Sequence, residues 1–192
     1  MGQLVWQFAN GLDYAPVEKA NYRRRPKSVG NSTTLKENAC SLEMIKPVIY
    51  RLSESVAARM REDFLKCRGI QISVRDSEFG RIERQKILFS PTYLASELAE
   101  EALMLIDEAY DFKIPVRAVG IKAINLVDSD LYQMTIYEQD KLKKEQLEIS
   151  IDSIRKRFGN LSVTRGIVMR DEFISKLDIK ESNVIFPISY FK

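Results

Sequence analysis

The stretch IQISVRDSEFGRIERQKILF, residues 70–89, decides the fold of this chain. Its first part alternates apolar and polar side chains, with Ile70, Ile72 and Val74 on one side and Gln71, Ser73 and Arg75 on the other. Such alternation predicts a half-buried strand with one polar face. DSEFG at 76–80 has the composition of a turn, and RIERQKILF at 81–89 is typical of a second strand. The sequence therefore predicts a β-hairpin.

Amphipathic helices are predicted on both sides of the hairpin. From Met44 to Leu65, apolar residues recur at helical spacing: Ile45, Val48, Ile49, Leu52, Val56, Met60 and Phe64. Pro47 is compatible with this helix only in the first turn, where a missing N–H costs nothing. After the hairpin, Thr92 can cap a second helix, whose apolar stripe consists of Leu94, Leu98, Leu105 and Ala109.

Two further strands complete the pattern. The Ser- and Thr-rich segment 27–35 precedes the first helix, and VRAVGIKAINL at 116–126 follows Pro115. The order is then strand, helix, strand, strand, helix, strand. It predicts an α+β fold of the ferredoxin-like β-α-β-β-α-β type, a four-stranded sheet with both helices on one face.

The second face of that sheet has no predicted helix to cover it. We expect its side chains to be Gln71, Ser73, Arg75, Arg84, Lys86, Ala118, Gly120 and Lys122. This set is polar and basic, which suits the phosphate backbone of a nucleic acid without much sequence readout. It contains no aromatic pair, so a base-stacking RNA-recognition sheet is disfavoured.

Charge is distributed unevenly although the net charge is only +3. Residues 19–36 hold Lys19, Arg23, Arg24, Arg25, Lys27 and Lys36, with no acid among them. Residues 94–111 hold Glu97, Glu100, Glu101, Asp107, Glu108 and Asp111, with no base. A chain polarised in this way has one surface that attracts polyanions and another that repels them.

Composition limits the possible functions. The chain has 192 residues, of which 45% are hydrophobic and 30% charged, as in soluble globular proteins. It lacks histidine, so His-dependent catalytic triads and most zinc sites are excluded. Cys40 and Cys67 have no metal-type spacing, and two cysteines predict a reducing cytosol. We see neither a signal peptide nor an apolar run long enough for a membrane span.

Both ends of the chain lie outside this core pattern. GQLVWQFANGLD at 2–13 predicts the end of a helix that stops at Gly11, and 13–26 forms a tether with two prolines. A C-terminal helix is predicted over 141–158, with an apolar stripe of Leu142, Leu147, Ile151, Ile154 and Phe158. Short strands are predicted at 161–169 and 183–191.

Several segments together resemble one known family. PKSVGNSTT at 26–34, the paired helices and VRAVGIKAINL resemble the little-finger domain of Y-family translesion DNA polymerases. LVWQFANGLDYAPV at 4–17 looks like the close of that family's thumb and its linker. DLYQMTIYEQDKLKKEQLEISIDSIRKRFG at 130–159 resembles the C-terminal region of the UmuC-type, DNA polymerase IV-like branch.

The resemblance implies four parts. These are a thumb remnant with linker at 1–25, a little-finger DNA-binding domain at 26–128, a connector at 129–140, and a C-terminal helix with strands at 141–192. In this family the catalytic carboxylates, with their magnesium ions, lie in palm and fingers, N-terminal to the thumb. We therefore expect no catalysis and no cofactor in this chain alone. Its expected setting is the bacterial cytoplasm, at the nucleoid, during the SOS response.

The resemblance also implies a set of DNA contacts. Lys27, Ser28, Gly30 and Asn31 match the family's first strand, and Ser32 adds a hydroxyl. Arg23, Arg24 and Arg25 lie in the linker, where guanidinium groups bind phosphate oxygens in pairs. Arg117 and Lys122 match basic positions of the last strand, and Arg75, Arg84 and Lys86 belong to the hairpin. Pro26 and Ala118 depart from the family, in which basic residues are common at both places.

A second partner is implied by QMTIY at 133–137. It resembles the pentapeptide with which bacterial polymerases bind the sliding clamp. Gln133 would hydrogen-bond at the rim of the clamp's pocket, Met134 and Ile136 would fill an apolar cleft, and Tyr137 would be the large anchor. The alternative is that Ile136 and Tyr137 end a strand packed against the C-terminal helix.

Two other functions stay open from the sequence. The domain could be a protein-interaction module whose basic face binds an acidic or clamp-like partner rather than DNA. It could also be an unrelated RNA-binding domain of ferredoxin-like fold. The first expectation remains sequence-neutral binding of damaged or primer–template DNA, with no membrane partner.

Overall fold

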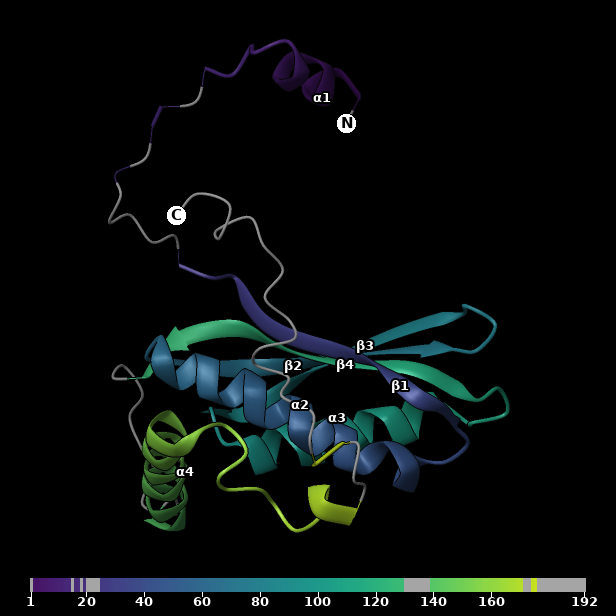
Figure 1. Ribbon diagram of the computed structural model, residues 1–192, viewed down its shortest axis with the longest axis vertical. Coiled ribbons are helices and arrows are strands. Elements are labelled where there is room, and N and C mark those ends of the chain that lie inside the picture. The colour runs from purple at the N-terminus through teal and green to yellow at the C-terminus, as the bar shows by residue number, and fades with distance from the viewer. Residues whose placement is uncertain are drawn as a thin grey trace.

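The computed structural model describes residues 2–14, 16–17, 19, 25–129, 139–170 and 174–175. Its elements follow one another as shown in Figure 1. They are α1 (Gly2–Ala9), β1 (Ser28–Ala39), α2 (Leu42–Glu62), β2 (Leu65–Asp76), β3 (Arg81–Thr92), α3 (Ala95–Ala109), β4 (Val116–Asp128), α4 (Gln139–Phe158) and the 3-10 helix η3 (Val168–Arg170).

The predicted hairpin is confirmed. Strands β2 and β3 pair antiparallel, with Arg75 opposite Arg81 and Gly69 opposite Ile87. Asp76 holds the turn, because its Oδ1 accepts the N–H groups of Glu78 at 2.9 Å and Gly80 at 2.7 Å. A Cβ at position 80 would lie 2.3 Å from Asp76 Oδ2, so any larger residue would displace the carboxylate that holds the turn.

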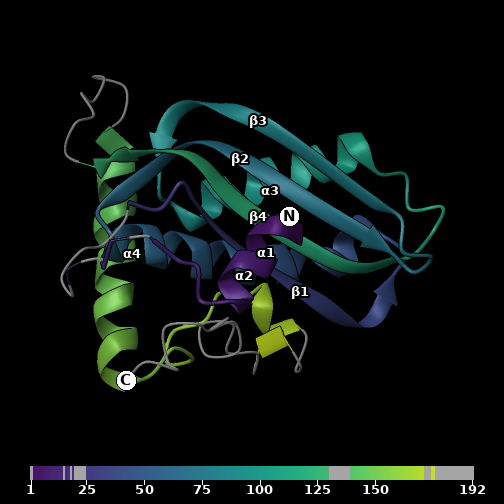
Figure 2. The same ribbon diagram turned by 90° about the horizontal axis from the view of Figure 1, so that it is seen from above.

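The four strands form one antiparallel sheet in the order β1-β4-β2-β3 (Figure 2). β4 and β2 are central, while β1 and β3 are the outer strands. The element order and the α+β class agree with the prediction, whereas the order of strands across the sheet was not predicted. β1 continues beyond the predicted 27–35 to Ala39.

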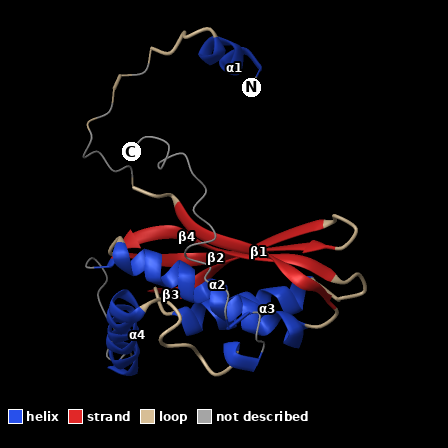
Figure 3. Ribbon diagram, viewed as in Figure 1, coloured by secondary structure: helices blue, strands red, loops and turns tan. Residues whose placement is uncertain are grey.

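Helices α2 and α3 cover one face of the sheet, as predicted (Figure 3). The core lies between them and the sheet, where alternate strand residues meet the apolar stripes of both helices. Its largest fully buried side chains include Ile45, Ile49, Leu52, Met60, Ile70, Ile72, Leu98 and Ile106.

Two helix starts differ from the prediction. α2 begins at Leu42, so Pro47 lies in the second turn rather than the first and forfeits a hydrogen bond to the carbonyl of Glu43. α3 begins at Ala95 with Leu94 as its N-cap residue, and no side chain caps it. Thr92 instead ends β3, and its hydroxyl accepts the N–H of Leu94 at 3.0 Å.

The N-terminal helix α1 is confirmed but does not join the core. None of its residues is buried, and Trp6 is 60% exposed. Figure 1 draws it well away from the sheet. The chain leaves the helix at Gly11, which has a positive φ of 73°.

The C-terminal helix α4 is also confirmed, but two other C-terminal predictions are not. Residues 161–169 form turns that lead into η3 rather than a strand. The strand predicted at 183–191 lies outside the described residues. Among the helices that the structure describes, none is long and apolar enough to cross a membrane.

Candidate nucleic-acid interface

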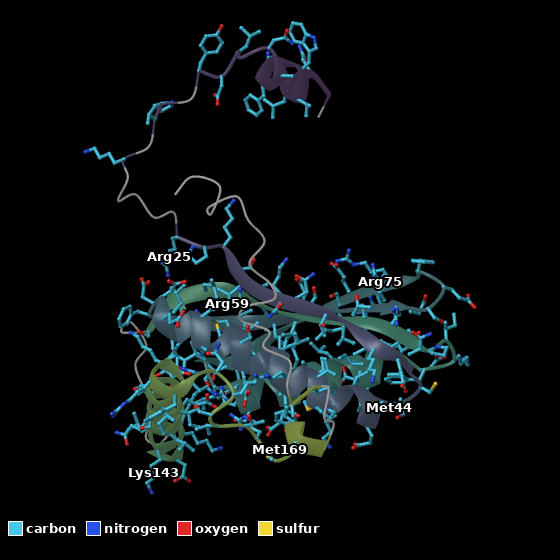
Figure 4. The ribbon with its side chains drawn as sticks, in the orientation of Figure 1. Arg25, Met44, Arg59, Arg75, Lys143 and Met169 are labelled. Atoms are coloured by element: carbon cyan, nitrogen blue, oxygen red, sulfur yellow. The ribbon has the colours of Figure 1, made fainter. Side chains whose placement is uncertain are left out.

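The sheet face opposite α2 and α3 carries the candidate interface. Residues directly opposite in antiparallel strands share a face, so the pairing assigns each side chain. We call this set the open face: Ser28, Gly30, Ser32 and Thr34 of β1; Ala118, Gly120, Lys122 and Ile124 of β4; Gly69, Gln71, Ser73 and Arg75 of β2; Arg81, Glu83, Gln85 and Ile87 of β3. Figure 4 marks Arg75 on this side of the sheet.

Most of the expected face is confirmed. Gln71, Ser73 and Arg75 lie beside Lys122, Gly120 and Ala118, which they pair with across the β2–β4 ladder. Lys122 and Arg75 are exposed. Ser28, Gly30 and Ser32 of β1 extend the same surface. Hydroxyl groups and two cationic side chains therefore converge on one side of the two central strands.

The placement of Arg84 and Lys86 on this face is wrong. They pair with Ile72 and Ile70, whose side chains are buried under the helices, so both belong to the helix side. Lys86 Nζ lies 2.8 Å from Glu101 Oε2 of α3. This hydrogen bond raises the pKa of Lys86 above its ordinary value. Arg81, Glu83 and Gln85 occupy the open face instead.

The expected placement of Asn31 against DNA is also wrong. It pairs with Ile121 on the core side, and its Nδ2 donates to Ser55 Oγ of α2 at 3.1 Å. Its side chain thus links strand β1 to the helix layer rather than facing outward. Ser32, the next residue, takes the place on the open face.

Arg117 is likewise engaged within the fold. Arg75 pairs with Ala118 and Asp76 with Val116, so Arg117 is the extra residue of a β-bulge. Its Nη1 donates to the carbonyl of Leu35 at 3.0 Å. Arg117 of β4 therefore forms a hydrogen bond that links its strand to β1, and it is not among the open-face residues.

The linker arginines are placed only in part. Arg23 and Arg24 lie outside the described residues. Arg25 forms an exposed ion pair with Asp128 at the end of β4, with Nη2 2.9 Å from Oδ1. Lys27 is exposed one residue before β1 begins. Figure 4 shows Arg25 where the chain enters the sheet.

A shallow hollow of about 330 Å³ lies in the middle of the open face. Its lining includes Gly30, Ser32, Gln71, Ser73, Arg81, Glu83, Gly120 and Lys122. Gly120 makes the floor, because a Cβ there would lie 2.6 Å from Ser73 Oγ and 2.9 Å from Ser32 Cβ. The hollow presents hydroxyl, amide and ammonium donors, which can hydrogen-bond and neutralise phosphate oxygens.

Arg59 of α2 is a residue of this region that sequence reasoning missed. Its Nη2 donates to the carbonyl of Gly30 at 2.6 Å, on the outer strand β1. Burial lowers the pKa of Arg59 below its ordinary value. Nothing in the helical pattern of 44–65 distinguishes this arginine, because its partner is a backbone atom distant in sequence.

Acidic side chains gather on the other side of the molecule. Glu97, Glu100, Glu101, Asp107 and Glu108 belong to α3, in the layer opposite the open face. The described residues contain no group of three or more acidic, cysteine or histidine side chains that could hold a metal ion.

Comparisons with known proteins agree on one family. Residues 26–136 match the C-terminal domain of the impB/mucB/samB family. DNA polymerase IV of Acetivibrio thermocellus is 37% identical over 179 residues, which are 92% of this chain and 45% of that protein. DNA polymerase IV 1 of Halalkalibacterium halodurans is 32% identical over 191 residues, 96% of this chain and 44% of that protein.

One solved structure, a Y-family DNA polymerase chimera, is similar with a TM-score of 0.46 and 19% identity, over 66% of this chain and 35% of the chimera. The chain spans about half the length of the curated relatives that it matches.

Proposed function

This chain belongs to the impB/mucB/samB family of Y-family DNA polymerases, and we propose that its open face binds primer–template DNA during damage bypass. The contacts are made to the sugar–phosphate backbone and are neutral toward sequence. The domain thereby acts as the little finger that holds a polymerase on its template.

The observation that carries this proposal is a basic sheet face that neither α2 nor α3 covers among the described elements. Lys122, Arg75 and Arg81 supply positive charge, and the hydroxyls of Ser28, Ser32 and Ser73 supply short donors. Contacts of this kind fix a protein on a duplex without reading its bases. A damaged base leaves the phosphates in place, so such a surface tolerates lesions.

We propose that nucleotide addition belongs to the part of the relatives that this chain does not match, where palm and fingers supply the carboxylates and magnesium. The residues described above position the duplex and neutralise its phosphates, and they take no chemical step.

Charge reversal on the open face tests this function. Fluorescence anisotropy with a labelled primer–template should show an affinity that falls steeply with salt, with a log–log slope of about −5 if about six phosphates are contacted. Lys122→Glu combined with Arg75→Glu should abolish binding at moderate salt. The control is Lys46→Glu combined with Lys113→Glu. It changes the net charge by the same amount at residues outside the open face, so this variant should still bind DNA. Equal losses in the two pairs would contradict the proposal.

The finer proposal is tethering to a bacterial sliding clamp through Gln133, Met134, Ile136 and Tyr137. These residues lie outside the described part of the chain, so the support is the sequence pattern alone. Two weak sites on one chain raise the local concentration of each partner.

A peptide covering residues 131–140 should bind a purified bacterial clamp at micromolar strength, about −8 kcal/mol. Gln133→Ala with Tyr137→Ala in the whole chain should remove clamp binding and leave DNA binding intact. Clamp binding that survives both substitutions would show that the segment is only a connector.

The second candidate function is a protein-interaction module without DNA binding. Exposed apolar side chains on α4, including Leu147, Ile149 and Phe158, favour it. Excess duplex DNA separates the two candidates. A chain that binds the clamp but no duplex is an interaction module alone. If duplex does bind, a clamp complex that persists uses a different surface, whereas a complex that DNA displaces uses the open face.

A further inference from the structure

Glu83 stands out on the open face because of its charge. Among the open-face positions of the part of the chain that the structure describes, it is the one acidic residue. It lies on the outer strand β3, directly opposite Ser73 of β2. A carboxylate on a surface that binds phosphate opposes that binding by like-charge repulsion.

The carboxylate of Glu83 also engages two donors of the same face. Its Oε1 accepts from Arg81 Nη2 in an ion pair, and its Oε2 accepts from Gln71 Nε2 at 2.8 Å. All three residues line the central hollow beside Lys122. The two oxygens of Glu83 thus receive hydrogen bonds that two oxygens of a phosphate would otherwise take.

We propose that Glu83 is a built-in competitor of DNA phosphate that limits the affinity of the open face. Arg81 Nη2 and Gln71 Nε2 can give these hydrogen bonds to a phosphate only when Glu83 releases them. This inference rests on the proposed DNA binding and adds a residue that sets its strength.

The exposure of the pair fits such a displacement. The side chains of Arg81 and Glu83 are 65% and 42% exposed, so their ion pair is screened by water and weak. A polyanion can therefore displace the carboxylate, whereas a buried pair would resist. Weak binding also lets the domain release and regain DNA as the primer grows.

Glu83→Gln and Glu101→Gln make a matched comparison. Each removes one negative charge from a carboxylate that pairs with a basic residue of β3, Arg81 on the open face or Lys86 on the helix face. At about 50 mM salt, Glu83→Gln should tighten binding of a labelled duplex about three- to tenfold, while Glu101→Gln should change it less than about twofold. The salt slope of Glu83→Gln should steepen by about 0.9, the value for one more phosphate contact.

Arg81→Gln provides a second measurement. In the Glu83→Gln background it should cost more affinity than in the wild-type chain, because there no carboxylate competes with phosphate for the Arg81 guanidinium. If the glutamine of Glu83→Gln still accepts the hydrogen bond from Gln71, Glu83→Ala repeats the comparison without that bond. Circular dichroism checks that each variant is folded.

The inference is overturned if Glu83→Gln and Glu101→Gln bind alike, or if Arg81→Gln costs the same in both backgrounds. In that event the proposed function still stands, provided that Lys122→Glu with Arg75→Glu weakens binding. A wild-type chain that does not bind duplex at all overturns both.

Discussion

Gly120 shows how a single residue shapes the open face. It lies on the central strand β4 with Ser73 of β2 opposite on one side and Ser32 of β1 on the other. Since a Cβ would come within 2.9 Å of Ser32 Cβ, an atom attached to the backbone, the strands themselves would have to shift. The missing side chain keeps the hollow open and the two hydroxyls close together.

Gly120→Ala should therefore destabilise the domain by about 1–3 kcal/mol, the usual cost of overpacking. It should also weaken DNA binding, because the methyl group fills the floor of the hollow. Urea denaturation and anisotropy measure the two effects. Gly166→Ala is the control, since a Cβ there meets nothing within 4 Å. A Gly120→Ala chain as stable as the control would mean that the sheet absorbs the methyl group.

At the scale of elements, helix α4 docks in an unusual way. Its buried side chains include Glu145 and Glu148, while Leu147 and Phe158 are 59% and 64% exposed. Lys66 pairs with Glu145 at 2.8 Å, and Arg61 pairs with Asp152 at 2.5 Å and with Glu148 at 3.2 Å. The charged face of α4 thus attaches to the domain. Of the apolar stripe expected from the sequence, Leu142, Leu147, Ile154 and Phe158 are exposed and Ile151 is half-buried.

A carboxylate of α2 completes this attachment. Glu54 accepts hydrogen bonds from Arg51 at 3.0 Å, Arg155 at 3.1 Å and Arg165 at 2.9 Å. Arg155 belongs to α4 and Arg165 to the segment after it. Buried ions of this kind are stable only with their partners, because an unpaired buried charge is costly.

Arg61→Ala should accordingly cost about 3 kcal/mol, the lower end for a broken buried pair, because Glu148 keeps Arg165 and Asp152 is partly exposed. Arg61 is only 6% exposed, whereas Lys113 and Asp111 form an exposed pair whose removal should cost less than about 1 kcal/mol. Hydrogen exchange should show amides of α4 losing protection before those of the sheet.

Leu147→Ser is the control for Arg61→Ala, because it changes an exposed apolar residue of α4. Because this side chain is exposed, its replacement should change stability by less than about 0.5 kcal/mol. If Leu147→Ser destabilises as much as Arg61→Ala, the helix is held by its apolar stripe after all.

At the scale of the whole molecule, charge is sorted onto opposite sides. The open face carries Lys122, Arg75 and Arg81, and α3 carries its acids in the layer beyond the core. The thickness of the domain therefore separates a duplex on the open face from the α3 carboxylates, which weakens their repulsion of its phosphates. This separation matters more than the small net charge of +3.

Charge reversal on α3 tests the separation. Glu100→Lys with Asp107→Lys raises the net charge by four, yet at physiological salt it should alter DNA affinity less than about threefold, because the Debye length is about 8 Å. The effect should shrink further as salt is raised. Anisotropy at two salt concentrations measures it, and a large gain at both would indicate that DNA also touches α3.

The amino-acid sequence by itself determined the elements and their order. The alternation from Ile70 to Arg75, the helical spacing from Ile45 to Met60 and the DSEFG turn are local signals, which short stretches of chain carry without a partner. They were enough to predict the α+β class, both helices on one side and a polar second face. The family resemblance added the polymerase relatives.

Only the tertiary structure decided which side chains meet. Arg84 and Lys86 face the helices because Arg75 pairs with Arg81 across the turn, and a shift of one residue moves every side chain to the other face. The strand order, the Arg59 bond to Gly30 and the docking of α4 through Glu145 and Glu148 join residues far apart in sequence. A helical stripe indicates that a face is apolar, but the neighbouring charges, here Arg61 and Lys66, determine which face is buried.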